Sequence, residues 1–210
     1  MTVTITRNPN LSVPSSSKKS ENEILKKFGN SWWTGLAPQN CPGFNHEKNY
    51  LQALPLLNLD ICTRQDVLDY FDNEWTLTEL LFQGLKKEEA YIRPPYHQLR
   101  HPLIFYYGHT CVLFINKMRL AGLIEKSVDP YLEKILEIGV DEMSWDDMAK
   151  NEMAWPSVAE VHAYRKKCYD VNHIFIQETK EVVTNDGYHF CRATLAPATW
   201  TAYFDNFFRD

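Results

Sequence analysis

Hydrophobic residues recur at helical spacing in three long stretches of the chain. The first stretch follows Thr63 and Asp66, which have the spacing of a capping box at a helix start. Its apolar stripe comprises Val67, Phe71, Trp75, Thr78, Leu81 and Leu85. The pattern predicts an amphipathic helix over about residues 63–85, with this one stripe facing a core.

The second stretch is the most apolar part of the chain. It lies in RHPLIFYYGHTCVLFINK, residues 100–117, where positions 102–115 carry no ionised side chain and are interrupted only by Gly108, His109 and Thr110. Pro102 suits the first position of a helix, and Gly122 suits its C-terminal end. We expect a helix from Pro102 to about Leu120 that is apolar nearly all round and the most buried of the bundle.

The third stretch opens at Pro156 and Ser157 through the capping box SVAE. Its apolar positions repeat at three- and four-residue intervals: Val158, Val161, Tyr164, Cys168, Val171 and Phe175. This spacing is typical of a helix packed lengthwise on others. Two shorter helices are expected before it, one bracketed by Asp129-Pro130 as N-cap and N1 and by Gly139 as C′, and one capped by Ser144 with Asp147.

These elements predict an all-α fold, a helical bundle with three long helices. The turn-rich stretch NSWWTGLAPQNCPG should form a collar held on the bundle by Trp32 and Trp33. We divide the chain into a flexible leader (1–23), a helical domain (24–183) and an aromatic-rich tail (184–210) that replaces a fourth helix. A short helix in the tail would place most of its aromatic residues on one side, where they could fill a groove of the bundle: Trp200, Tyr203, Phe204, Phe207 and Phe208.

Composition narrows the range of partners and compartments. A net charge of −5 and a pI near 5.8 give no general attraction to nucleic acid or to anionic membranes. No apolar run reaches the roughly 18–20 residues of a membrane span, and residues 1–20 lack the apolar core of a secretory signal. Five cysteines without a CxxC pair are typical of reduced thiols in the cytosol, so we expect a cytoplasmic protein.

His109 is the first candidate for chemistry, because a neutral imidazole in an apolar helix needs a hydrogen-bond partner or a metal ion. An unsatisfied ring would cost about 1–3 kcal/mol. For a lone histidine, a hydrogen bond to a side chain of a neighbouring helix is the more frequent solution. One residue does not decide between these alternatives.

The other histidines do not converge with His109 in the sequence pattern. His97 and His101 have H-x-x-x-H spacing, but prolines flank them and a turn pair is expected. His101 is separated from His109 by about 12 Å along a helix axis, too far for one ion. His162 and His173 are expected at the surface.

The carboxylates and the known catalytic motifs add no further candidate. Carboxylates cluster in DEMSWDDMAKNE and DYFDNEWTLTE, where solvated faces and helix caps are expected. The sequence contains no nucleophile elbow, phosphate-binding glycine loop, dinucleotide fingerprint or zinc ribbon, which argues against several large enzyme classes.

Several strings resemble a known family. RPPYHQLRHPLIFYYGHTCVLFINKMRLAGLI, GVDEMSWDDM, WPSVAEVHAYRKKCYDV, WWTGLAPQNCPG and YFDNEWTLTELLF are similar to the N-terminal region of 5-histidylcysteine sulfoxide synthases of ovothiol biosynthesis. The resemblance covers about residues 30–171. It implies a DinB-like helical bundle, which precedes a domain similar to formylglycine-generating enzymes and a methyltransferase domain in full-length members.

The resemblance also implies a chemistry. The family couples the thiol of cysteine to the imidazole of histidine with O2, at a non-haem Fe(II) held by three histidines. His109, within YYGHT, matches the first iron ligand, and the resemblance therefore favours the ligand alternative for this residue. The other two ligands of the family come from an H-x-x-x-H-x-E helix.

This sequence departs from the family where that helix is expected. After YRKKCYDV it continues NHIFIQETKEVV, in which His173 is followed four residues later by Gln177. With one matching ligand of three, we expect weak or no iron binding and no catalysis by the chain alone. Two alternatives stay open: a regulatory module that binds a full-length synthase or another protein, and a DinB-like metal-dependent thiol transferase in which His189 and Cys191 join His109.

Overall fold

The computed structural model describes residues 22–29, 32–58, 61–96, 100–120, 122–137 and 154–178. Of these residues, 61% are helical and 3% lie in strands, so the predicted all-α class is confirmed. The elements are α1 (Glu23–Phe28), the 3-10 helix η2 (Pro38–Asn40), β1 (Phe44–Asn45), β2 (Tyr50–Leu51), α2 (Arg64–Gln83), α3 (Glu88–Ile92), α4 (Leu103–Leu120), α5 (Pro130–Leu136) and α7 (Val158–Glu178).

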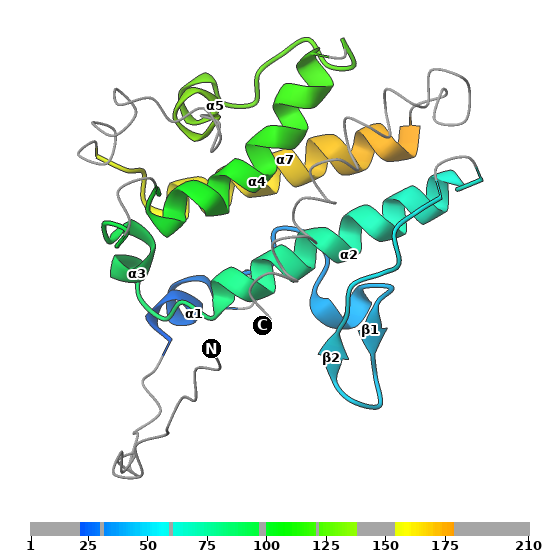
Figure 1. The fold of residues 1–210 in the computed structure, drawn as a ribbon, viewed down its shortest axis with the longest axis horizontal. Helices are drawn as coiled ribbons and strands as arrows, with labels where there is room; N and C mark the ends of the chain where they lie inside the picture. Colours follow the sequence, from blue (N-terminus) through cyan, green and yellow to red (C-terminus); the bar gives the residue numbers. More distant parts are fainter. Residues whose placement is uncertain are drawn as a thin grey trace, which may run out of the picture.

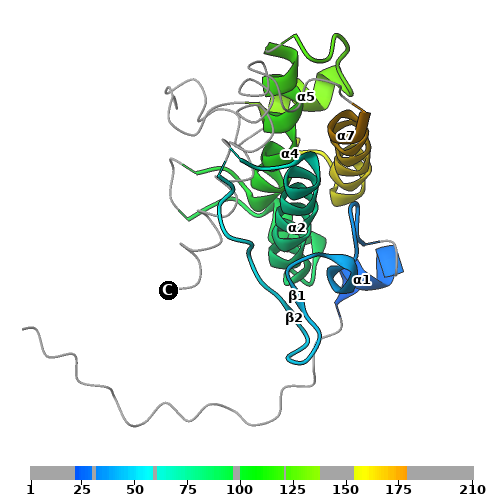
Figure 2. The ribbon, with the colours of Figure 1, turned by 90° about the vertical axis from the view of Figure 1, so that its right-hand side faces the viewer.

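The three long helices α2, α4 and α7 form the body of the molecule (Figure 1). Helices α4 and α7 run in the same direction and pack along each other, whereas α2 runs in the opposite direction (Figures 1 and 2). Helix α5 packs on α4, and α3 lies at the start of α4. The predicted positions of the three long helices are therefore confirmed.

Local sequence explains where the helices begin and end. Thr63 accepts a hydrogen bond from the backbone of Asp66, whose carboxylate accepts from the Thr63 backbone, so the predicted capping box of α2 is confirmed. Ser157 and Glu160 make the same reciprocal pair at α7. At the end of α4, Gly122 adopts a φ of 70°, the left-handed conformation that terminates a helix.

The start of helix α5 is as predicted. The carboxylate of Asp129 accepts hydrogen bonds from the backbone N–H groups of Tyr131 and Leu132, as expected of an N-cap followed by proline. The helix ends at Leu136 with Glu137 as its C-cap, and the predicted C′ residue Gly139 and the expected helix at Ser144 lie outside the described residues.

One prediction about α2 is wrong: its buried surface is not a single stripe. All nine residues from 71 to 79 are buried, whereas Leu81, a predicted stripe member, is 45% exposed. Helix α2 lies between α7 and the segment that carries η2, β1 and β2, and both sides of its middle turns are therefore covered.

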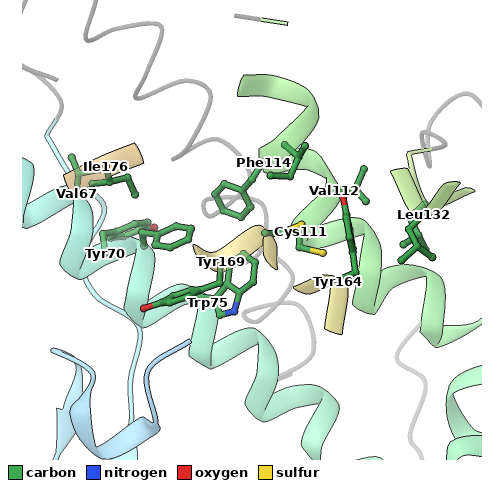
Figure 3. Close-up of a cluster of buried hydrophobic side chains, with 14 of the residues drawn as sticks. Val67, Tyr70, Trp75, Cys111, Val112, Phe114, Leu132, Tyr164, Tyr169 and Ile176 are labelled. Carbon is green, nitrogen blue, oxygen red and sulfur yellow. The ribbon is translucent and has the colours of Figure 1, made fainter. Parts of the chain in front are cut away.

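The principal hydrophobic core lies among α2, α4 and α7 (Figure 3). Phe71 of α2 stacks on Tyr169 of α7 and meets Phe114 of α4 edge to face, with ring centroids 5.6 and 5.4 Å apart. Tyr164 and Cys168 of α7 lie against Cys111 of α4 in the same core. Every long helix thus contributes aromatic or sulfur-containing side chains to one contiguous cluster.

The collar predicted around Trp32 is confirmed as a packing element. Trp32 is 1% exposed and stacks on Tyr107 of α4 with a centroid distance of 5.9 Å. The antiparallel pair β1–β2, which was not predicted, lies beside α2. There Asn73 accepts a hydrogen bond from the backbone of Gly43 and donates one to the carbonyl of Gln52, so an α2 side chain holds both strands.

A buried ion pair joins α2 to α7. Nε of Arg165 lies 3.4 Å from Oε1 of Glu79, and the two side chains are 1% and 0% exposed. The guanidinium lies between the rings of Trp75 and Tyr107 and donates to the Tyr107 carbonyl and to Thr110. Burial lowers the pKa of Arg165, but Tyr107 and Glu79 raise it above the ordinary value, which keeps this group charged.

Candidate metal-ligand site

His109 lies in the middle of α4, where its imidazole is held by a backbone group of α5. Its Nδ1 lies 2.6 Å from the carbonyl oxygen of Leu136. The ring thus has the hydrogen-bond partner that was one of the two alternatives, and this partner is a main-chain carbonyl near the end of a short helix instead of a side chain. The last carbonyls of a helix lack partners within it, and this position is well suited to receive an external donor.

This contact fixes the tautomer of the ring. A carbonyl oxygen only accepts hydrogen bonds, so Nδ1 of His109 must carry the proton and donate it to Leu136. In the neutral ring the lone pair is then on Nε2. Metal-binding histidines commonly have this arrangement, in which the second nitrogen donates to a carbonyl or a carboxylate.

Gly108 allows α5 to approach the helix this closely. A Cβ atom at position 108 would lie 2.5 Å from Cδ1 and 2.9 Å from Cδ2 of Leu136, closer than side-chain carbons can approach. Leu136 is fully buried, so its side chain has little room to move aside. In the sequence YYGHT, Gly108 therefore allows α5 to pack close to α4, and His109 donates a hydrogen bond to α5 at the same place.

His101 and His109 lie on either side of one aromatic ring. Phe105 is 4.3 Å from His101 and 4.8 Å from His109, measured between ring centroids. The ring of Phe105 therefore separates the imidazoles, as the axial spacing predicted, and the two do not form a joint site. Trp155 contacts both His101 and Phe105 and extends this aromatic row.

The surroundings of His109 favour its neutral form. Burial lowers the pKa of the imidazole below its ordinary value, the hydrogen bond to Leu136 raises it, and the nearby His101 lowers it further. The net direction is downward. Because a metal ion binds neutral imidazole, this environment keeps the ring in the form that a ligand requires.

The lowered pKa predicts a pH dependence of stability. In the unfolded chain the His109 pKa returns to about 6.5, so between that value and the lower folded-state pKa the unfolded state binds more protons. The free energy of unfolding should therefore decrease as the pH falls below about 6.5 and be fully regained above it. Replacing His109 with glutamine should remove this part of the dependence.

Urea unfolding of the wild type and His109→Gln at several pH values between 5 and 8 measures this difference. The two curves of unfolding free energy against pH should differ in slope below about pH 6.5 and run parallel above it. Parallel curves over the whole range would show that His109 does not have a lowered pKa in the folded protein.

Two further histidines, His162 and His173, belong to α7, and each lies near a polar side chain of another helix. His162, expected at the surface, is 7% exposed, and its Nδ1 lies 2.8 Å from the hydroxyl of Tyr107. That expectation is wrong because the collar covers this turn of α7, with Trp32 5.1 Å from the imidazole. His173 is half-buried, with Nε2 3.6 Å from Oδ2 of Asp72. His97 lies outside the described residues.

Three carboxylates of α2 are buried, although about half of the positions in the two carboxylate clusters were expected to be capping or solvent-facing. Asp72, Glu74 and Glu79 are at most 5% exposed. Asp72 accepts a hydrogen bond from the hydroxyl of Tyr169, and Thr34 donates to Glu79 through both its backbone and its hydroxyl. Asp72 therefore connects α2 to α7, and Glu79 connects it to the collar and to α7.

Among the described residues, no group of three or more His, Cys, Asp or Glu side chains is placed to hold a metal ion. His109 remains the candidate ligand from the sequence, and within the described ranges no two further ligand side chains converge on it. His189 and Cys191, the alternative companions, lie outside the described residues. No helix in the described part of the chain has the length and apolar character needed to cross a membrane.

Comparison of the chain with models of known protein families gives no match, and comparison with curated proteins gives none either. The functional interpretation therefore rests on the sequence strings and on the geometry around His109.

Proposed function

We propose that this chain is a DinB-like N-terminal portion of a 5-histidylcysteine sulfoxide synthase, the enzyme type of ovothiol biosynthesis. In this proposal the chain provides a helical scaffold and one iron-ligand histidine, His109. The substrates of the complete enzyme would be cysteine and histidine, with O2 as the oxidant. A full-length synthase is the proposed protein partner.

One observation carries the proposal: the imidazole of His109 donates Nδ1–H to the carbonyl of Leu136. This bond leaves the Nε2 lone pair for a ligand and orients the ring before any ion binds. Burial lowers the pKa of the same ring, so no proton competes with a metal ion near neutral pH. The resemblance of YYGHT to the iron-binding segment of the family favours a ligand over a histidine that is only hydrogen-bonded in the core.

The donor set of the described residues fits one position of a ferrous site and not the whole site. Imidazole nitrogen is a suitable ligand for Fe(II), which in the family activates O2 for carbon–sulfur bond formation. The other two imidazoles would have to come from outside the described residues. We therefore assign His109 the role of holding and orienting, propose that the chain is inactive alone, and assign no catalytic step to its residues.

Iron binding by the purified full chain tests the proposal. After anaerobic incubation with Fe(II) and removal of the excess, elemental analysis should find less than one iron per chain, and His109→Ala should remove most of it. His46→Ala, at an exposed site beside β1, serves as the control and should retain the wild-type amount. Mass spectrometry after addition of cysteine, histidine and O2 should detect no coupled sulfoxide.

Two outcomes would contradict different parts of the proposal. Equal iron in the wild type and His109→Ala would show that His109 is not the ligand. One iron per chain together with formation of the sulfoxide would show that the chain is a complete catalyst.

A further inference from the structure

The last turns of α7 border an apolar groove on the surface of the bundle. A hollow of about 420 Å³ is lined by Ile124, Val171, Ile174, Phe175 and Glu178, and we call it the α7 groove. The hollow is wide open to solvent, so it suits a segment that lies across the surface better than an enclosed small molecule. His109 is not among the residues that line the groove, and its imidazole is bonded to the Leu136 carbonyl of α5.

The lining of the α7 groove is suited to apolar side chains. Val171 and Phe175 are partly buried against the principal core, so one wall is rigidly supported, whereas Ile174 is 51% exposed. Four of the five lining residues are aliphatic or aromatic, and Glu178 provides a single negative charge at one end. An occupant would therefore present apolar side chains with a basic residue beside them.

The chain itself contains a segment with these properties. Positions 200, 203, 204, 207 and 208 are Trp, Tyr, Phe, Phe and Phe, followed by Arg209. Their spacing of three and four residues is the anchor pattern of a helix that binds in a groove. The aromatic side chains match the apolar lining.

The covalent connection favours this segment over a separate molecule. Glu178 both lines the groove and is the last described residue of α7, and Trp200 lies 22 positions after it in the sequence. Such a connection can span at most about 70 Å, much more than the groove requires. A tether of this kind gives an effective concentration on the order of millimolar, above that of any free partner at ordinary protein concentrations.

We propose that residues 200–208 dock into the α7 groove of the same chain, with their aromatic side chains against Ile174 and Phe175. The segment then covers the exposed part of the last two turns of α7. This inference is independent of the proposed iron site, because none of the groove residues contacts His109.

Photo-cross-linking of the full chain tests the docking. With p-benzoylphenylalanine in place of Ile174, irradiation of the purified protein should join position 174 to a peptide within residues 196–209. The yield should be independent of protein concentration over a tenfold range, and Trp200→Ala with Phe204→Ala should reduce it several-fold. The same cross-linker at exposed Ala163, about 16 Å away along α7, should not reach this peptide.

The outcomes separate the possible occupants. Cross-links between two chains, with a yield that rises with concentration, would overturn the proposal in favour of a second copy. Absence of cross-links to residues 196–209 would overturn it outright. If circular dichroism shows that the position 174 variant is unfolded, the cross-linker at exposed Gln177, beside Glu178, gives the same test.

Discussion

Replacing Arg165 with methionine is expected to lower the free energy of unfolding by about 3–5 kcal/mol, the cost of removing one partner from a buried ion pair. Glu79 would remain fully buried, with Thr34 as its hydrogen-bond donor and no neighbouring positive charge. Burial raises the pKa of Glu79 and Arg165 lowers it, so the variant carboxylate would have to take up a proton or admit water. Urea unfolding monitored by circular dichroism measures the loss.

Two further variants separate the ion pair from general effects on α7. Lys166→Met changes the neighbouring residue, whose exposed pair with Asp170 should contribute less than about 0.5 kcal/mol. Glu79→Leu combined with Arg165→Met removes both charges and should recover much of the loss, because no buried charge is left without a partner. If the free energy of unfolding of Arg165→Met lies within 1 kcal/mol of the wild-type value, the ion pair does not hold α2 to α7.

The features of the fold that were predictable from sequence depend on short separations along the chain. The capping boxes at Thr63 and Ser157 each involve residues three positions apart, and the structure contains both. The apolar spacing that marks α2, α4 and α7 likewise repeats within four residues. Such signals locate helices without any knowledge of what packs against them.

The errors concern contacts between distant parts of the chain. Glu79 and Arg165 are 86 positions apart, and the charge pattern around Glu79 indicated a solvated face because its partner is invisible locally. His162 was expected at the surface for the same reason, since Trp32 of the collar covers it. Burial of a polar residue depends on the tertiary structure, which periodicity does not describe.

Sequence signals at short range identified one part of the candidate site, the histidine itself, but not its hydrogen-bond partner. Because an imidazole within the most apolar helix needs a hydrogen-bond partner or a metal ion, His109 was identified as a candidate, and the family resemblance favoured a metal ligand. The partner that orients it, the Leu136 carbonyl, is 27 positions away and belongs to the main chain, so no side-chain pattern could indicate it. Gly108 marked the place only as an interruption of the apolar run.

Replacing Gly108 with valine is expected to lower the free energy of unfolding by about 2–4 kcal/mol. A new side chain would overlap that of Leu136, and overpacking of a buried contact costs about 1–3 kcal/mol. Displacement of α5 would also break the hydrogen bond from His109 to the Leu136 carbonyl, for a further loss of about 1 kcal/mol. Glycine is otherwise a poor helix residue by about 1 kcal/mol, so a loss would show that the close contact outweighs propensity.

Two comparisons establish the cause of this loss. Lys117→Val places the same side chain at an exposed position of α4 and should cost less than 1 kcal/mol, which isolates the effect of a β-branched residue on the helix. Leu136→Ala leaves space beside position 108, so Gly108→Val should cost much less in a Leu136→Ala background than in the wild type. Equal costs in both backgrounds would mean that Gly108 does not set the distance between α4 and α5, and the orientation of His109 would then need another explanation.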